Sequence, residues 1–242
     1  MDKRVLLVIP AYNEEKNIKK TCGSVDLYNK KNKTKIDYIV INDGSLDNTS
    51  LVLKNNNINH IDLIANLGIG GAVQTGFKYA LYNNYDIAVQ FDGDGQHDIS
   101  FINDLINPIL KGNANMVIGS RFIEKEKEGF KSSRARRLGI KIISFFIKLK
   151  TKTKIYDVTS GYRAIDLDLI KQFSNYYPSE YPEPISSVNA LKNNFRIVEV
   201  PVVMKERKHG KSSISSWKNV YYMINVILSI ILMKGKRKWV NL

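Results

Sequence analysis

The sequence predicts an α/β protein with a mostly parallel central sheet covered by helices on both faces. Over the first 120 residues, short runs of apolar and β-branched residues alternate with stretches of helical spacing. The runs are continuously apolar, as expected of strands buried on both sides. Each run also ends in a polar or glycine-containing turn. Ligands of such sheets bind beyond the carboxyl ends of the strands, so we expect the functional residues there.

The expected elements follow in chain order. Strands are predicted at 5–10, 36–43, 60–65, 86–92 and 115–120, and helices at 14–29, 46–55 and 69–83. The first apolar run stops at Pro10 with no small-residue cleavage site after it, so it is interpreted as a buried strand and not as a signal peptide. With no internal repeat or low-complexity linker, we expect one catalytic domain over residues 1–212 and a C-terminal helical appendage over residues 213–242.

The positive charge is concentrated in two segments. The chain of 242 residues has a net charge of +14. Residues 111–154 hold 13 Lys and Arg against 3 acids, and residues 201–242 hold 9 against 1. Because both segments are also apolar, they indicate an anionic membrane surface or a lipid phosphate as partner. Nucleic acid is disfavoured because no helix-turn-helix, zinc-finger or aromatic RNA-binding pattern is present, and the single cysteine, Cys22, excludes an intramolecular disulfide.

The strongest local signal is the pair Asp92 and Asp94 directly after a predicted strand. Two carboxylates at this spacing repel each other unless a cation lies between them. Oxygen ligands of this kind suit Mg²⁺ or Mn²⁺, which commonly bridge to substrate phosphates, and Gln96 offers an amide oxygen beside them. The alternative is a turn that caps the helix expected near Ser100.

Two further strand ends carry weaker signals. Asp43 ends the second predicted strand, where a carboxylate can accept hydrogen bonds from a ribose or a base; simple turn chemistry is the alternative. The glycine-rich stretch 66–76 opens a helix, whose N-terminal amides favour an anion. It lacks the G-K-[ST] of a P-loop and follows the third strand and not the first, so it is not a dinucleotide fingerprint.

Six motifs occur in order along the chain: IPAYNEE, NDGSLDNT, NLGIGGA, FDGDGQHD, IGSRF and SGYRA. With them the sequence resembles the family 2 glycosyltransferases, which have the GT-A fold. Within that family it is similar to the dolichol-phosphate mannose synthase and polyprenyl-phosphate glycosyltransferase branch. The resemblance implies an inverting, metal-dependent transfer from a nucleotide-diphosphate sugar to a polyprenyl phosphate at the cytoplasmic membrane face. A UDP-sugar is the favoured donor, with GDP-mannose as the alternative.

The resemblance also implies roles for individual residues. The nucleotide-sugar contacts would be made at the strand ends and in the late basic loop, by Pro10, Ala11, Tyr12, Asn13, Glu14, Asp43, Asn66, Gly70, Asp92, Gly93, Asp94, Arg207 and Lys211. Asp92, Asp94 and Gln96 would hold Mg²⁺ or Mn²⁺. Arginines would hold the acceptor phosphate, with Arg121, Arg134, Arg136 and Arg137 as the matching positions. Asn42 departs from the pattern, because many members have an aspartate there.

The acceptor decides which residues are catalytic. A hydroxyl acceptor needs a carboxylate base, and Asp157 and Glu183 are the candidates, whereas a lipid phosphate is already anionic and needs none. Arg121 is the third candidate catalytic residue. Besides the polyprenyl phosphate, two alternatives stay open: a hydroxyl acceptor on a lipid-linked saccharide in cell-envelope polysaccharide synthesis, and a non-catalytic module that binds nucleotide sugar or lipid.

Two segments predict attachment to a membrane surface. Residues 134–150 form an expected amphipathic helix, with Arg134, Arg137, Lys141 and Lys148 on one face and Leu138, Ile142, Phe145, Phe146 and Leu149 on the other. Residues 220–233 are uncharged, but they are shorter than the roughly 20 residues that span a bilayer. We therefore expect a peripheral enzyme, held by its C-terminal helix, with a small membrane protein or a second copy of the chain as a possible partner.

Overall fold

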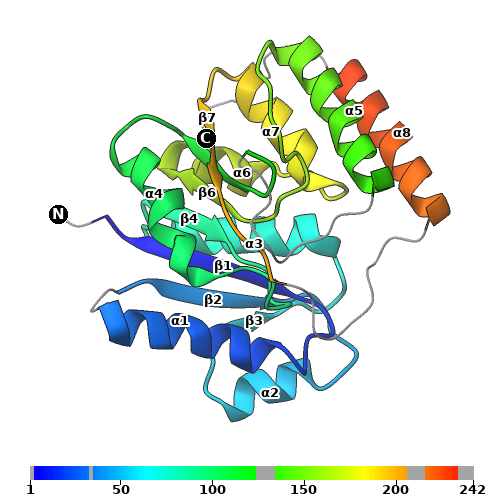
Figure 1. The fold of residues 1–242 in the computed structure, drawn as a ribbon. Coiled ribbons are helices and arrows are strands. Elements are labelled where there is room, and N and C mark those ends of the chain that lie inside the picture. The colour runs from blue at the N-terminus through cyan, green and yellow to red at the C-terminus, as the bar shows by residue number, and fades with distance from the viewer. Residues whose placement is uncertain (1–2, 33–34, 124–133, 206–215, 234–242) are drawn as a thin grey trace.

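The computed structural model describes residues 3–32, 35–123, 134–205 and 216–233 (Figure 1). They contain a seven-stranded sheet with the strand order β3-β2-β1-β4-β6-β5-β7. In chain order the strands are β1 (Val5–Ala11), β2 (Asp37–Asn42), β3 (His60–Asp62), β4 (Ile87–Gln90), β5 (Met116–Ser120), β6 (Arg163–Asp166) and β7 (Ile197–Pro201). Only β6 runs antiparallel to its neighbours, so the predicted mostly parallel sheet is confirmed.

Helices cover both faces of the sheet, as predicted. One face packs against α1 (Ile18–Asn32), α2 (Thr49–Asn55) and α4 (Ile102–Leu110). The other packs against α3 (Gly68–Tyr82), α5 (Arg134–Thr151), α6 (Leu167–Asn175), α7 (Pro182–Lys192) and α8 (Ser216–Leu232). In Figure 1, α5 and α8 lie side by side at the outer edge of this second layer.

Strand β1 shows why the apolar runs are continuous. Leu6 and Val8 belong to the core on the α3 side, whereas Leu7 and Ile9 belong to the core on the α1 side. A strand in the middle of a doubly covered sheet has no face left for polar side chains. Helix α3 packs directly on this strand at Gly76. The approach is so close that a Cβ at this position would lie 2.0 Å from Cγ1 of Val8.

Several boundaries differ from the prediction. The helix expected from residue 14 begins at Ile18, because Asn13 has a positive φ of 56° and the residues after it are tied to the 45–49 loop. The strand expected over 60–65 ends at Asp62. The last two strands were not predicted: β6 has only four residues and ends in charged side chains, and β7 is only partly buried.

Helices α5 and α8 each bury one side and expose an apolar stripe on the other. On α8 the stripe comprises Tyr221, Ile224, Leu228, Ile231 and Leu232. Two lysines hold the end of α8, since Lys150 Nζ donates to the Ile231 carbonyl at 2.7 Å and Lys192 Nζ to the Met233 carbonyl at 2.8 Å. Within the described ranges, no helix combines the length and the apolar character needed to cross a membrane.

The expected faces of α5 need a correction. The sequence placed the lysines opposite Leu138, Phe145 and Leu149, but Lys141 and Lys148 share the exposed side with these residues. The reason is that Ile140, Ile143 and Ile147 pack inward and turn both groups outward. The surface of α5 is therefore a mixed basic and apolar one.

Candidate functional site

The predicted donor residues converge at the carboxyl ends of β1, β2 and β4. Pro10 and Ala11 end β1, and their carbonyl groups accept hydrogen bonds from Gly93 N at 3.2 Å and Asp43 N at 2.9 Å. Asp43 follows β2 directly, and Asp92 lies two residues beyond β4. The structure therefore brings together residues that are up to about 80 positions apart in the sequence, at the edge where parallel α/β sheets bind ligands.

The loop after β1 is fastened to the loop after β2. Asn13 N donates to Ser45 Oγ at 2.9 Å, and Asn13 Oδ1 accepts from Leu46 N at 2.8 Å. Glu14 N donates to Thr49 Oγ1 at 2.9 Å. These bonds give Asn13 and Glu14 a role in fixing the loop, while the ring of Tyr12 is exposed at the same edge. Direct contact of these three residues with a nucleotide stays a prediction.

Asp43 is buried and caps the N-terminus of α3. Its Oδ1 accepts from Leu67 N at 2.7 Å. Burial raises the pKa of Asp43, although the backbone hydrogen bonds at the start of α3 oppose the rise. The glycine-rich stretch 66–76 therefore directs its first amides to a carboxylate of this chain, which explains its weak likeness to a phosphate loop.

Asn66 and Gly70 also have local roles. Asn66 Oδ1 accepts from Gly68 N at 3.0 Å in the turn that opens α3. Gly70 is packed against the 178–179 backbone, where an added Cβ would lie 2.1 Å from the Pro178 carbonyl oxygen. Both residues belong to the segment that opens α3, beside Asp43. Their contacts with the donor stay predictions.

Asp92 is oriented by two neighbouring side chains. Gln90 Nε2 donates to its Oδ1 at 3.1 Å. The buried His97 accepts from Asp92 N through Nδ1 at 3.0 Å, so its proton is on Nε2, which lies 3.5 Å from Asp92 Oδ2. His97 is itself stacked on Tyr162, with ring centroids 4.7 Å apart. The carboxylate of Asp92 is thus held in place before any ligand binds.

The next turn supplies two more oxygen donors. Asp94 is largely buried, and its Oδ1 accepts from Gln96 N at 3.0 Å. Gln96 Nε2 donates to the Lys205 carbonyl at 3.2 Å, which leaves the amide oxygen as the atom of Gln96 suited to a cation. Lys205 also bonds Gln96 O through its backbone N–H at 2.9 Å, so the chain after β7 is anchored on this turn.

The donor set of Asp92, Asp94 and Gln96 fits Mg²⁺ or Mn²⁺, because all three offer hard oxygen atoms from one short turn. Among the residues that the structure describes, no three His, Cys, Asp or Glu side chains cluster as a metal site. A cation here would therefore use the amide of Gln96 and oxygen atoms from a substrate to complete its coordination.

Glu183 lies beside the same cluster. It stands in the first turn of α7, half-buried, with Gln90 near its carboxyl group. Burial raises the pKa of Glu183, and the nearby charge of Asp92 raises it further, against the opposing effect of Arg163. An elevated pKa is what a general base near neutral pH requires, so the predicted role of Glu183 is compatible with its surroundings.

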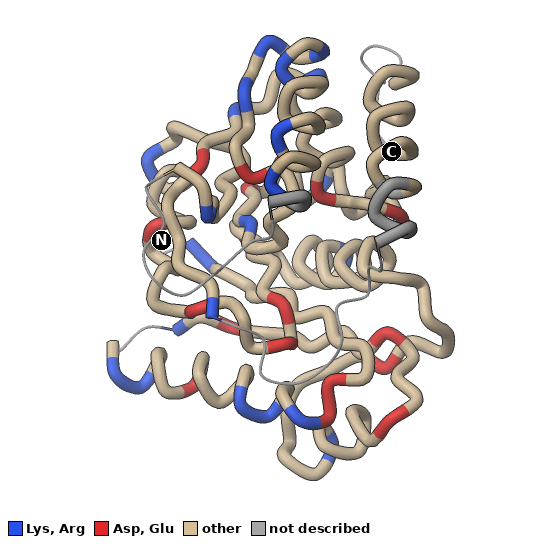
Figure 2. The backbone as a smooth tube through the Cα atoms, turned by 45° about the vertical axis from the view of Figure 1, so that its right-hand side comes forward, with Lys and Arg blue, Asp and Glu red and all other residues tan. Residues whose placement is uncertain are grey.

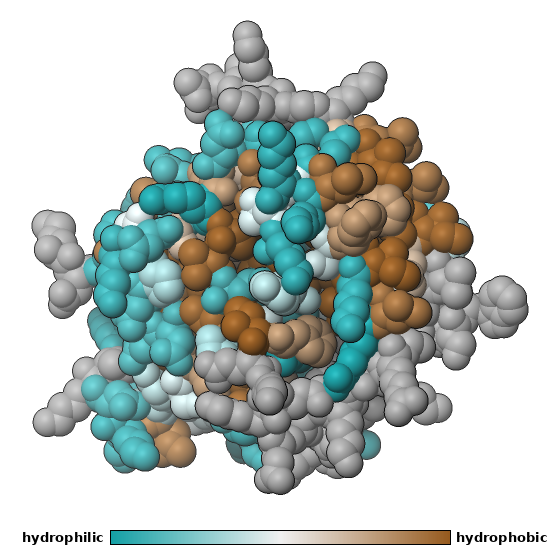
Figure 3. Space-filling view, turned by 45° about the horizontal axis from the view of Figure 1, so that its top comes forward, coloured by the Kyte–Doolittle hydropathy of each residue, from teal (hydrophilic) through white to brown (hydrophobic). Residues whose placement is uncertain are grey.

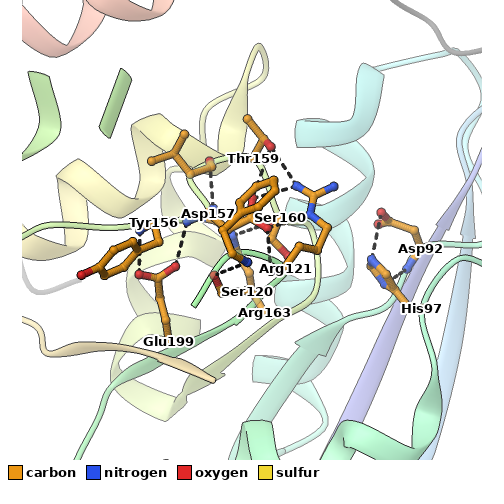
Figure 4. A network of polar contacts seen from close by, with 12 residues as sticks. Asp92, His97, Ser120, Arg121, Tyr156, Asp157, Thr159, Ser160, Arg163 and Glu199 are labelled. Atoms are coloured by element: carbon orange, nitrogen blue, oxygen red, sulfur yellow. Dashed lines mark hydrogen bonds and ion pairs between the residues drawn. The ribbon is translucent and has the colours of Figure 1, made fainter. Parts of the chain in front are cut away.

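Arg121 and Asp157 form a buried ion pair (Figure 4). Arg121 Nε and Nη2 donate to the two carboxylate oxygens of Asp157 at 2.7 Å each. The side chain of Arg121 is 7% exposed and that of Asp157 is fully buried. The guanidinium group therefore engages both carboxylate oxygens of Asp157. The geometry makes Asp157 the counter-ion of Arg121, while the predicted roles of Asp157 and Glu183 as a base stay predictions.

The remaining predicted residues are placed only in part. Arg137 is half-buried on α5. The side chains of Arg134 and Arg136 lie outside the described part of the chain, as do Arg207 and Lys211. Figure 2 shows basic residues along α5 and acidic residues around the ends of the parallel strands. Basic residues also occur on α1, so the two kinds of charge are mixed elsewhere on the molecule.

Comparison with known proteins decides the family. The sequence profile described as "Glycosyl transferase family 2" matches residues 6–173, more than half of the chain. The chain belongs to glycosyl transferase family 2. It is therefore a glycosyltransferase, as the ordered motifs predicted.

Two relatives lie in the branch that the motifs indicated. A UDP-N-acetylglucosamine–dolichyl-phosphate N-acetylglucosaminyltransferase of Methanococcus voltae is 33% identical, over 96% of this chain and 97% of the relative. A polyprenol monophosphomannose synthase of Mycolicibacterium smegmatis is 29% identical, over 88% of this chain and 82% of the relative. The predicted resemblance to polyprenyl-phosphate glycosyltransferases is confirmed by these relatives.

A solved structure confirms the GT-A fold. The glucosyl-3-phosphoglycerate synthase of Mycobacterium tuberculosis, in complex with Mn²⁺, UDP-glucose and phosphoglyceric acid, matches with a TM-score of 0.68. The match covers 93% of this chain and 80% of that chain at 16% identity. At this identity the likeness concerns the fold alone.

Some residues of this family 2 glycosyltransferase's site were missed by sequence reasoning. His97 lies inside the FDGDGQHD motif, so its proximity to Asp92 and Asp94 was a usable signal. Gln90 precedes the same motif by one residue, but nothing in the sequence distinguishes it from other residues of the strand. Glu199, described below, lies in a strand that was not predicted, and its sequence context offers no comparable signal.

Proposed function

We propose that this glycosyltransferase transfers a sugar from a nucleotide-diphosphate sugar to a polyprenyl phosphate, with inversion at the anomeric carbon. The observation that carries the proposal is that Asp43 and the Asp92–Asp94 turn flank the end of β1, where Asp43 N bonds the Ala11 carbonyl and Gly93 N the Pro10 carbonyl. The relatives support the acceptor, because their names specify dolichyl phosphate and a monophosphorylated polyprenol.

The donor side consists of Asp43 and Tyr12 for the nucleoside and the Asp92–Gln96 turn for the diphosphate. A UDP-sugar is favoured, since one relative is named for UDP-N-acetylglucosamine and one structural neighbour contains UDP-glucose. A Mg²⁺ or Mn²⁺ ion bound there would neutralise the negative charge that builds on the leaving diphosphate. Arg207 and Lys211 are proposed to add positive charge to the same group.

The chemistry is a single displacement that needs no protein base. An oxygen of the acceptor phosphate forms the bond to the anomeric carbon while the bond to the diphosphate oxygen breaks. The nucleoside diphosphate leaves with the electron pair, and no proton has to move because the phosphate is already anionic. Arg121, with Arg134, Arg136 or Arg137, is proposed to hold the acceptor phosphate by charge-assisted hydrogen bonds.

The acceptor is proposed to reach the site from the cytoplasmic face of a membrane. Leu138, Phe145 and Leu149 of α5 are exposed next to the apolar stripe of α8. Figure 3 shows apolar surface gathered on this side of the molecule, interspersed with hydrophilic side chains. An apolar surface carrying lysines is suited to lie in the interface of an anionic bilayer, so we propose peripheral attachment through α5 and α8.

A second candidate uses the same donor and a hydroxyl acceptor on a lipid-linked saccharide. The observation that favours it is the raised pKa of Glu183 beside Asp92. In that reaction Glu183 would take the proton of the attacking hydroxyl, a contribution that typically amounts to about 10²- to 10⁴-fold in rate.

The first experiment measures transfer to undecaprenyl phosphate in detergent micelles with Mn²⁺ and a panel of UDP- and GDP-sugars. Mass spectrometry detects the glycosylated lipid. Undecaprenol, which carries a hydroxyl in place of the phosphate, is the matched control acceptor. We expect product with the phosphate and not with the alcohol. If no donor yields product with the phosphate, the proposed function is wrong.

The variant Glu183→Gln separates the two candidates. Transfer to the phosphate is expected to stay within about threefold of the wild type, because no proton is abstracted. A loss of a hundredfold or more, with Mn²⁺-dependent UDP binding retained, would contradict a transfer that needs no base, and the hydroxyl candidate instead predicts that this variant loses transfer to a lipid-linked saccharide. Asp168→Asn, which changes an exposed acid on α6, is the control.

A further inference from the structure

Arg121 is held by an unusually complete set of bonds. It follows β5 at the same sheet edge as Asp92, and its backbone N–H and guanidinium group both bond to Asp157. Thr159 Oγ1 accepts a further bond from Arg121 Nη2 at 3.0 Å. Two parallel bonds between a guanidinium and a carboxylate fix the plane of the arginine as well as its position.

Asp157 is in turn held by a third element of the fold. Glu199 of β7 accepts a hydrogen bond from Asp157 N through Oε1 at 2.8 Å and one from Tyr156 N through Oε2 at 2.7 Å. Both oxygens of one carboxylate thus clamp the turn that carries Asp157. Figure 4 shows Glu199 below this turn, with the Asp157–Arg121 pair on its other side.

Stability alone does not explain why three charged groups are kept here. Burial raises the pKa of Glu199, which means that its ionised form is disfavoured, although the bonds from Tyr156 and Asp157 oppose this effect. A buried ion pair is commonly no more stabilising than well-packed apolar side chains of similar size. The arrangement does give Arg121 one fixed orientation, which an apolar substitute would not.

We propose that Glu199 is a positioning residue that acts through Asp157 to set the orientation of the Arg121 guanidinium toward the acceptor phosphate. This inference rests on the proposed function, because it takes a lipid phosphate as the ligand of Arg121. Glu199 itself touches neither substrate.

The test measures binding of farnesyl phosphate, a soluble short-chain phosphate, and of UDP with Mn²⁺ to the full chain by microscale thermophoresis. In Glu199→Gln the amide retains one acceptor oxygen but turns an N–H₂ group toward the other backbone N–H. The turn must then shift, and with it Asp157 and Arg121. We expect farnesyl phosphate to bind roughly tenfold more weakly, as for the loss of one hydrogen bond to a charged group, with UDP binding unchanged.

A double-variant comparison separates positioning from a general structural effect. In an Arg121→Met background, Glu199→Gln is expected to cause no further loss of farnesyl phosphate binding, because the group it positions is gone. Asp157→Asn is expected to act like Glu199→Gln, and it replaces that variant if the latter does not fold. Glu180→Gln, on an exposed acid, is the matched control.

The outcomes distinguish the two levels of the argument. If Glu199→Gln changes farnesyl phosphate binding by less than twofold, or weakens it equally with and without Arg121, the positioning role is wrong. If the wild type binds farnesyl phosphate no better than farnesol, or Arg121→Met binds it like the wild type, it is the proposed function of Arg121 that fails.

Discussion

The proposed donor edge, around Asp92 and Asp94, and the proposed acceptor side, around Arg121, are assembled in different ways. At the donor edge, Asp92 and Asp94 bond mainly to near neighbours: Gln90, Gln96 and His97 all lie within five residues of Asp92. On the acceptor side, Arg121 depends on Asp157, 36 residues away, which depends on Glu199 another 42 residues on. The difference teaches that the internal contacts of a site made from one turn can be recognised in a sequence. The pairing of Arg121 with Asp157 could not be, although both residues were predicted.

The two regions also differ in charge and polarity. The donor edge carries buried acids suited to a cation and a nucleotide. The acceptor side carries a buried arginine, and the exposed surface of α5 and α8 beyond it combines lysines with Leu138 and Phe145. If the two regions are separate, a substitution in one should impair its own binding function and leave that of the other unchanged.

The largest effect is expected from Asp94→Ala. Loss of this carboxylate removes a proposed cation ligand from the Asp92–Gln96 turn, so kcat/KM is expected to fall by at least about a hundredfold. Mn²⁺-dependent thermal stabilisation by UDP is expected to disappear, while farnesyl phosphate binding persists. Asp104→Ala, on an exposed acid of α4, serves as control. Unchanged stabilisation by UDP and Mn²⁺ would show that the donor edge is not where we place it.

A smaller effect is expected from Phe145→Glu on α5. The side chain is 60% exposed, so folding should tolerate the change, but a charge replaces apolar surface that would enter the bilayer interface. Binding to vesicles containing phosphatidylglycerol is expected to weaken by about tenfold, as measured by sedimentation. Leu27→Glu, at an equally exposed leucine of α1 on the opposite layer, is expected to bind like the wild type. Equal loss in both variants would mean that α5 is not the membrane-facing surface.

The smallest effect concerns pH and the strand end next to Asp43. Burial alone would raise the pKa of Asp62, but hydrogen bonds from Asn42, Ser50 and Lys54 outweigh it and lower the pKa to about 2. The stabilisation is therefore complete above the usual pKa of an aspartate, near 4, and is lost as the pH falls toward 2.

Urea unfolding of the wild type and Asp62→Asn provides the measurement. At pH 6 the wild type is expected to be more stable by less than about 1 kcal/mol, because Asp62 is partly exposed. At pH 2.5 the difference should shrink. A difference that grows on acidification would contradict the assigned shift.

Much of the fold and of the donor edge could be predicted because the signals are local. The run VLLVI is apolar on both faces, which indicates a central strand, and Asp92 and Asp94 stand directly after another such strand. Parallel strands end at the same edge of a sheet, so Asp92 and Asp94 were expected to lie beside the residues that follow the run VLLVI. His97 lies within the same motif, so its place near Asp92 could be predicted, but its hydrogen bond to Asp92 N could not.

The rest depended on contacts that the sequence does not display. Strand β6 is short, and its charged residues Arg163 and Asp166 are not typical of a buried strand. Its pairing with β4 and β5 nevertheless completes the sheet. Asp157 was predicted, with Glu183, as a candidate base, and nothing nearby in the sequence indicates its ion pair with Arg121. The faces of α5 were mistaken because the inward direction is set by α7 and α8, which pack on it from later in the chain.

Helix α3 has a consequence for how donor preference can change in evolution. It lies against Val8 at Gly76 and against the 178–179 backbone at Gly70, and the amide of Leu67, just before the helix, bonds to Asp43. Because helix α3 is held at these three places, the carboxylate of Asp43 keeps a fixed position relative to the sheet. A related enzyme that uses a different nucleotide would therefore have to change exposed side chains such as Tyr12, because the position of helix α3 is fixed.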